Sequence, residues 1–116
     1  MKQIIINKLG GEIMGTPELN ALAVLHLQKQ IQEKYAVVVV VSALKNITDT
    51  LIDGINKLVQ DTHGFHIQDF CEQFMKLHIE HALGLYKNKE NIEKLRLALD
   101  EECEGLKNSF DFIRNF

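Results

Sequence analysis

Five consecutive valines at residues 37–41 constrain the fold of this chain more than any other feature. With Tyr35 and Ala36 they predict a strand that is apolar on both sides, because neighbouring residues of a strand point to opposite faces of a sheet. Such strands are typical of parallel sheets that are covered on both faces. We therefore expect an α/β fold in which other elements cover both faces of this strand.

The segment before the valines supplies the rest of a parallel unit. Its apolar run predicts a first strand over residues 2–8, and Thr16 followed by Pro17 predicts the start of a helix that continues to about Glu33. A strand, a helix and a second strand make a right-handed βαβ crossover, which brings the carboxyl ends of both strands to one edge of the sheet. Ligands of open α/β sheets bind at that edge.

Two loops are expected at this edge. The first contains Lys8, Gly10 and Gly11, and the second begins at Ser42 and contains Thr48. Glycines between a strand and a helix allow backbone N–H groups to face an anion, and a lysine beside them neutralises phosphate charge. The second loop adds hydroxyl groups near the start of the next helix. Together the loops predict a phosphoryl-transfer site, because this chemistry depends on positioning and charge neutralisation.

The rest of the chain is expected to be helical. One helix ends at about Gln60, and two longer helices, over residues 67–86 and after Asn88, form a helical hairpin. We expect the hairpin, residues 65–116, to pack as a cap on the βαβα part, residues 1–60.

Two strands alone do not make a stable sheet when one of them is buried on both faces. Three explanations are open: more chain follows Phe116, a second subunit completes the sheet, or the helices rearrange into a smaller fold. We favour the first and regard residues 1–116 as an N-terminal fragment of a larger domain. The second explanation agrees with a homo-oligomer, which we also expect.

The composition argues against several classes of protein. A net charge of −3 without a cluster of lysines and arginines argues against nucleic-acid binding. The longest apolar run, residues 36–41, is far too short to cross a membrane, and the N-terminus lacks the pattern of a signal peptide. We expect a cytoplasmic protein whose Cys71 and Cys103 are reduced and buried.

Other groupings of reactive residues are weaker. His78 and His81 are three residues apart on a helix, with His63 and His66 nearby, which is a spacing that can bind a transition metal. Both helical histidines lie along an apolar stripe and no third ligand is indicated, so we expect packing and no metal site. The acidic residues Asp100, Glu101, Glu102 and Glu104 are expected on a solvated face, and no Ser-His-Asp or Cys-His triad can be assigned.

The sequence Lys-Leu-Gly-Gly at residues 8–11 resembles the Lys-Phe-Gly-Gly signature that opens aspartokinases, which belong to the amino acid kinase family. Residues 38–49 resemble the second signature of that family, at a matching distance from the first. Residues 15–18 and the stretch around 74–85 are similar too, so the resemblance covers nearly the whole chain. It is closest to the N-terminal part of aspartokinases, including those fused to homoserine dehydrogenase.

The resemblance implies the N-terminal part of a three-layer αβα fold. It also implies transfer of the γ-phosphoryl group of ATP, with Mg²⁺, to the side-chain carboxylate of L-aspartate, the first step of lysine, threonine and methionine biosynthesis. Lys8 would stabilise the phosphoryl group in transit as the catalytic residue, and Gly10 and Gly11 would offer N–H groups to the phosphates. Ser42 and Thr48 would contact aspartate.

Two departures from the family pattern bear on activity. Glu12 and Ile13 stand where the family has small hydroxyl residues, and a carboxylate beside a triphosphate is unfavourable unless Mg²⁺ or an arginine intervenes. The later catalytic, nucleotide-binding and regulatory parts of the family have no counterpart in 116 residues, so we expect negligible kinase activity from this chain alone. The alternatives are a truncated, non-catalytic self-associating or protein-interaction module of the same ancestry, and an unrelated small α/β binding domain.

Overall fold

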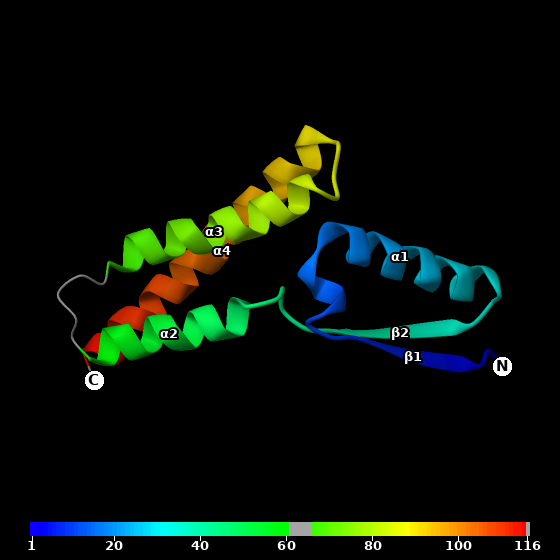
Figure 1. Ribbon diagram of the computed structural model, residues 1–116, viewed down its shortest axis with the longest axis horizontal. Helices are drawn as coiled ribbons and strands as arrows, with labels where there is room; N and C mark the ends of the chain where they lie inside the picture. The colour runs from blue at the N-terminus through cyan, green and yellow to red at the C-terminus, as the bar shows by residue number, and fades with distance from the viewer. Residues whose placement is uncertain (61–65, 116) are drawn as a thin grey trace. The chain divides into compact units, whose positions relative to one another are not determined.

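The computed structural model describes residues 1–60 and 66–115 of the chain, which form two compact units (Figure 1). Unit 1, Met1–Ile47, and unit 2, Thr48–Phe116, are described separately below. Unit 1 contains strands β1 (Ile4–Leu9) and β2 (Ala36–Val41), the short 3₁₀ helix η1 (Ile13–Gly15) and helix α1 (Pro17–Gln32). Helices α2 (Ile47–Val59), α3 (Ile67–Leu83) and α4 (Lys89–Arg114) make up unit 2, apart from the first residue of α2.

Strands β1 and β2 form a two-stranded parallel sheet, with Ile4 opposite Ala36 and Leu9 opposite Val41. Helix α1 connects the two strands, so the predicted βαβ crossover and the α/β class are confirmed. Both strands run in the same direction and end at the same edge of the sheet (Figure 1). The two loops that the sequence predicts to bind phosphate follow the strands at this edge.

The start of α1 follows the sequence prediction. Thr16 has extended backbone angles and its Oγ1 accepts a hydrogen bond from the backbone N–H of Leu19 at 3.2 Å. Pro17 occupies the first helical position, where its missing N–H costs nothing. Asn88 caps the start of α4 as Thr16 caps the start of α1, because its Oδ1 accepts a hydrogen bond from the backbone N–H of Glu90 at 2.9 Å.

Helix α1 ends in a turn that the sequence did not predict. The backbone N–H of Lys34 donates to the carbonyl of Ile31 at 2.9 Å, and that of Tyr35 donates to the carbonyl of Gln30 at 3.1 Å. These two bonds form a Schellman motif, which requires a left-handed residue after the helix. Lys34 takes this position with φ of 69°, although glycine suits it best.

Asn7 shows which face of the sheet α1 covers. Its side-chain amide exchanges two hydrogen bonds with that of Gln30, from Asn7 Nδ2 to Gln30 Oε1 at 2.8 Å and from Gln30 Nε2 to Asn7 Oδ1 at 3.2 Å. Side chains alternate along a strand, so the odd-numbered residues of β1 face α1. The even-numbered residues of β1, with their partners in β2, lie on the opposite face.

The prediction that both faces of the valine strand are covered is wrong for the residues that the structure describes. On the face away from α1, Val38 and Val40 are 46% and 50% exposed, and Ile4 and Ile6 are 68% and 69% exposed. The physical reason is that unit 1 has only two layers, one helix and one sheet, and α1 lies along a single face (Figure 1). An apolar sheet face is therefore left open to water, which is unfavourable in proportion to its area.

Unit 2 is held together by apolar contacts among its three helices. Phe70 of α3 and Phe110 of α4 meet edge to face, with their ring centroids 5.2 Å apart, and Phe110 is 1% exposed. Gly54 of α2 lies against the Phe70 ring so closely that a Cβ at residue 54 would be only 2.7 Å from Cε2 of Phe70. Helix α2 thus packs in the same unit as the predicted hairpin. No described helix has both the length and the apolar content needed to cross a membrane.

Candidate phosphate-binding edge

Three of the five predicted site residues lie in the two loops at one edge of the sheet, and a fourth ends the strand before the first loop. Lys8 is the second-last residue of β1, Gly10 and Gly11 follow that strand, and Ser42 follows β2. The backbone N–H of Ser42 donates to the carbonyl of Leu9 at 3.1 Å and extends the strand pairing by one step. The fifth predicted residue, Thr48, is the second residue of α2 and belongs to unit 2.

The glycine turn differs from the expected anion-binding geometry in its backbone. Neither Gly10 nor Gly11 has a positive φ, so the turn does not contain the alternating right- and left-handed residues of a backbone nest. The space beside both glycines is open, because a Cβ added to either one would meet no other atom within 4 Å. The turn is closed by a hydrogen bond from the backbone N–H of Met14 to the carbonyl of Gly10 at 3.0 Å. The side of the turn where these Cβ atoms would lie is therefore open.

Lys8 lies on the sheet face opposite α1, because its neighbour Asn7 bonds to that helix. Its side chain is exposed, and among the residues that the structure describes no carboxylate lies within ion-pair distance of its ammonium group. Ser42 is exposed as well, and its Oγ donates to the carbonyl of Ala43 at 2.8 Å. This bond lies within its own loop, so the hydroxyl must rotate in order to donate to a ligand.

An ion pair joins the two loops. Lys45 Nζ lies 3.5 Å from Oε1 of Glu12, with the two side chains 51% and 89% exposed. The stem of Lys45 lies over Gly15, since its Cδ would be 3.4 Å from a Cβ at that glycine. The sequence pointed to Mg²⁺ or an arginine as the cation that would have to offset Glu12, and the structure places a lysine there. The only signal in the sequence was the position of Lys45 in the second loop.

A partly buried polar network beside the residue that precedes Lys8 was also missed. Gln30 is 9% exposed, and its amide nitrogen contacts both Oδ1 of Asn7 at 3.2 Å and Nε2 of His26 at 3.0 Å. An amide nitrogen only donates, so Nε2 of His26 accepts and its proton is on Nδ1. The network ties α1 to the residue that immediately precedes Lys8. Asn7 stands within an apolar strand, which was the signal for a buried partner.

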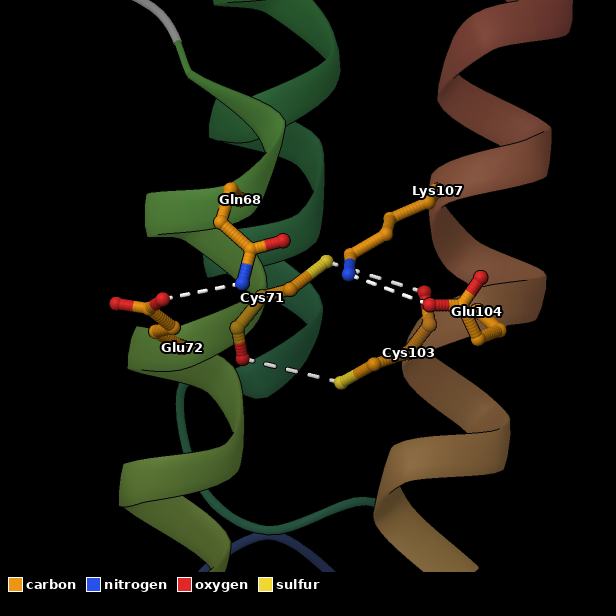
Figure 2. A network of polar contacts seen from close by, with 6 residues as sticks. All are labelled: Gln68, Cys71, Glu72, Cys103, Glu104 and Lys107. Atoms are coloured by element: carbon orange, nitrogen blue, oxygen red, sulfur yellow. Dashed lines mark hydrogen bonds and ion pairs between the residues drawn. The ribbon is translucent and has the colours of Figure 1, made fainter.

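The two cysteines face one another between α3 and α4 (Figure 2). The Cys71 thiol is 3.9 Å from the carbonyl of Cys103, and the Cys103 thiol is 3.8 Å from the carbonyl of Cys71. Burial raises the pKa of Cys71, and burial together with the neighbouring Cys71 raises the pKa of Cys103 to about 11. Both are free thiols in the core, which confirms the prediction that they are buried.

The histidines of the helical part have local roles. His78 Nδ1 donates to the carbonyl of Phe74 at 2.8 Å, and the two rings lie 4.4 Å apart. His66 is at the N-cap position of α3 without a capping bond from its side chain, and His63 lies outside the described residues. Within residues 1–60 and 66–115, no group of three or more histidines, cysteines or carboxylates could hold a metal ion.

Comparison with known proteins gave no match to this sequence, either among protein-family models or among curated proteins. The interpretation of the edge therefore depends on its own residues. They are two exposed lysines, two glycines with open space beside them and a hydroxyl group, at the ends of two neighbouring parallel strands and in the loops that follow them. This set of groups is suited to a polyphosphate, because ammonium and hydroxyl groups can all donate to phosphate oxygens.

Proposed function

We propose that this chain is the N-terminal part of an aspartate kinase and forms the phosphate-binding half of its active site. The enzyme transfers the γ-phosphoryl group of ATP to the side-chain carboxylate of L-aspartate in the cytoplasm. The observation that supports this proposal most is that the Lys-Leu-Gly-Gly sequence and Ser42 end two adjacent parallel strands at one edge. Phosphoryl transfer depends on such convergence of donors more than on a covalent nucleophile.

The groups at this edge have distinct proposed roles. The Lys8 ammonium neutralises charge on the transferred phosphoryl group, and the open backbone at Gly10 and Gly11 lets phosphate oxygens approach closely. Ser42 orients the aspartate substrate, and the resemblance implies the same role for Thr48. Mg²⁺ bound to the phosphates of the nucleotide would screen their charge, and Lys8 with the backbone N–H groups of Gly10 and Gly11 would bind the remaining phosphate oxygens.

The open sheet face agrees with a larger catalytic domain in the three-layer αβα arrangement of the amino acid kinase family. Ile4, Ile6, Val38 and Val40 present an apolar surface that an intact domain would cover with a further layer. We therefore propose that residues 1–116 alone do not turn over aspartate, because this edge supplies only part of the groups that phosphoryl transfer needs.

A hybrid enzyme tests this function. Residues 1–116 would replace the corresponding segment of an aspartokinase, and ADP release would be followed with and without L-aspartate. The proposal predicts aspartate-dependent turnover by the hybrid and its loss in the Lys8→Ala hybrid, with Lys29→Ala as a matched control on the far end of α1. A folded hybrid that hydrolyses ATP equally well without aspartate would reject the function.

The same open face favours a second candidate, a non-catalytic module that self-associates through unit 1. Four exposed aliphatic side chains on a sheet with unpaired outer edges are a template for association with another copy. Sedimentation of the chain at several concentrations would test it, since this candidate predicts a dimer that Val38→Lys and Val40→Lys disrupt. A monomer across the whole concentration range would exclude it.

A further inference from the structure

The ion pair between Glu12 and Lys45 gives the phosphate-binding edge a second cation. Lys45 comes from the loop after β2, and Glu12 from the turn after β1, so their contact spans the opening between the two loops. The aliphatic stem of Lys45 lies beside Gly15, where a Cβ added to the glycine would be 3.4 Å from Cδ of Lys45, and the ammonium group reaches Glu12 in the glycine turn. The lysine is therefore placed by two contacts, one apolar and one ionic.

The ionic contact is weak enough to exchange. Its nitrogen and oxygen are 3.5 Å apart, and most of the Glu12 side chain is in water. Exposed pairs of this kind contribute little, because water and salt screen the attraction and two long side chains must be ordered. A polyphosphate carries several negative charges and offers more acceptor oxygens than one carboxylate, so it competes well for the same ammonium group.

We propose that Lys45 is a polyphosphate-binding residue of this edge, and that Glu12 holds it in place when no anion is bound and releases it when one binds. The inference relies on the proposed function only for the location of the ligand, and it concerns residues to which the resemblance assigns no role. It also explains how a phosphate-binding turn can contain the negatively charged Glu12, since this carboxylate has its own counter-ion in Lys45. In the bound state Glu12 is left exposed to water, where its charge is readily solvated.

Titration of inorganic tripolyphosphate into the intact chain at low salt, followed by calorimetry, tests this inference. Lys45→Ala is expected to weaken binding by about five-fold or more, and Lys45→Arg to retain it, because the charge is kept. Glu12→Gln is expected to tighten binding by about two- to five-fold, since it removes a competitor whose contribution is that of one exposed pair. In the double variant the effect of Glu12→Gln should disappear.

Two matched variants control for the general effect of charge. Glu18→Gln removes a carboxylate from the first turn of α1, and Lys29→Ala removes a lysine from its last turn. Both are expected to change tripolyphosphate affinity by less than about two-fold. Circular dichroism would show that each variant keeps the helical content of the parent.

The outcomes separate this inference from the proposed kinase function. Loss of tripolyphosphate binding in Lys45→Ala would support the inference even if the hybrid enzyme showed no dependence on aspartate. No binding by the parent chain, or equal binding by the parent and Lys45→Ala, would overturn the inference even if the hybrid were active. Weaker binding by Glu12→Gln would overturn the role given to Glu12.

Discussion

The backbone N–H of Ser42 donates a hydrogen bond to the carbonyl of Leu9 at 3.1 Å, and this bond ties the end of β2 to the residue before the glycine turn. It keeps the two strands paired up to the point where both loops begin. A shift of one residue in strand pairing would move every side chain of β1 to the other face. The bond therefore helps to keep Lys8 and Ser42 at a fixed relative position on the candidate edge.

Alanine at Gly10 or Gly11 is expected to affect ligand binding without harming the fold. Neither residue has a positive φ and neither Cβ would meet another atom, so each variant should keep the stability of the parent or gain about 0.4–1 kcal/mol. The added methyl groups should weaken tripolyphosphate binding, because they occupy the space left for the anion. Urea unfolding and calorimetry would measure the two effects. A loss of more than about 2 kcal/mol of stability would show that the turn needs glycine for folding.

Glycine at residue 34 is expected to stabilise unit 1. Lys34 has φ of 69° in the Schellman turn, where a side chain costs about 1 kcal/mol relative to glycine. Lys34→Gly should therefore raise the free energy of unfolding by up to about 1 kcal/mol, while Lys34→Ala should give no gain. Chemical denaturation of the three proteins would compare them. Equal stability of the glycine and alanine variants would contradict the strain assigned to this turn.

Two helical glycines of unit 2 are expected to respond to alanine in opposite ways. A Cβ at Gly54 would be 2.7 Å from the Phe70 ring, so Gly54→Ala should destabilise the protein by about 1–3 kcal/mol. A Cβ at Gly105 would meet nothing within 4 Å, so Gly105→Ala should stabilise α4 by up to about 1 kcal/mol. The pair forms a matched test in thermal or urea unfolding. Similar effects of both changes would contradict the close packing of α2 on α3.

Alkaline pH is expected to destabilise the α3–α4 hairpin through Cys103. Burial raises the pKa of this thiol from 9.0 to about 11, so between these values the folded chain keeps a proton that the unfolded chain releases. The contribution of this raised pKa to the free energy of unfolding is complete below pH 9. It is lost as the pH rises from 9 through 11, by at most about 1.4 kcal/mol per pH unit. Unfolding measured at pH 8 and pH 10 should show a larger loss for the parent than for Cys103→Ala. An equal loss in both proteins would contradict the effect.

The sequence predicted local structure well where one short stretch determines it. The strand, helix and strand order, the Thr16 cap and the start of α4 after Asn88 follow from residues close together in the chain, and all are confirmed. The burial of Cys71 and Cys103 followed in the same way from the apolar stripes of two helices.

Other features depend on residues that meet only in three dimensions. The valine strand correctly predicted a parallel sheet, but its composition does not say which element covers it, and unit 1 leaves one face open. The contact between Glu12 and Lys45 spans two loops and could not be read from either one. The left-handed Lys34 was missed because its residue type gives no sign of a positive φ.

The affinity of tripolyphosphate for the Lys8→Ala variant tests the assignment of the phosphate-binding edge most directly. Lys8 is exposed and lies in the Lys-Leu-Gly-Gly sequence on which the resemblance and the proposed function both depend. Calorimetry should show that Lys8→Ala binds tripolyphosphate about ten-fold or more weakly than the parent, which corresponds to about 1.4 kcal/mol, while Lys29→Ala binds it as the parent does. Equal affinity of the parent and a folded Lys8→Ala variant would contradict a phosphate site at the end of β1.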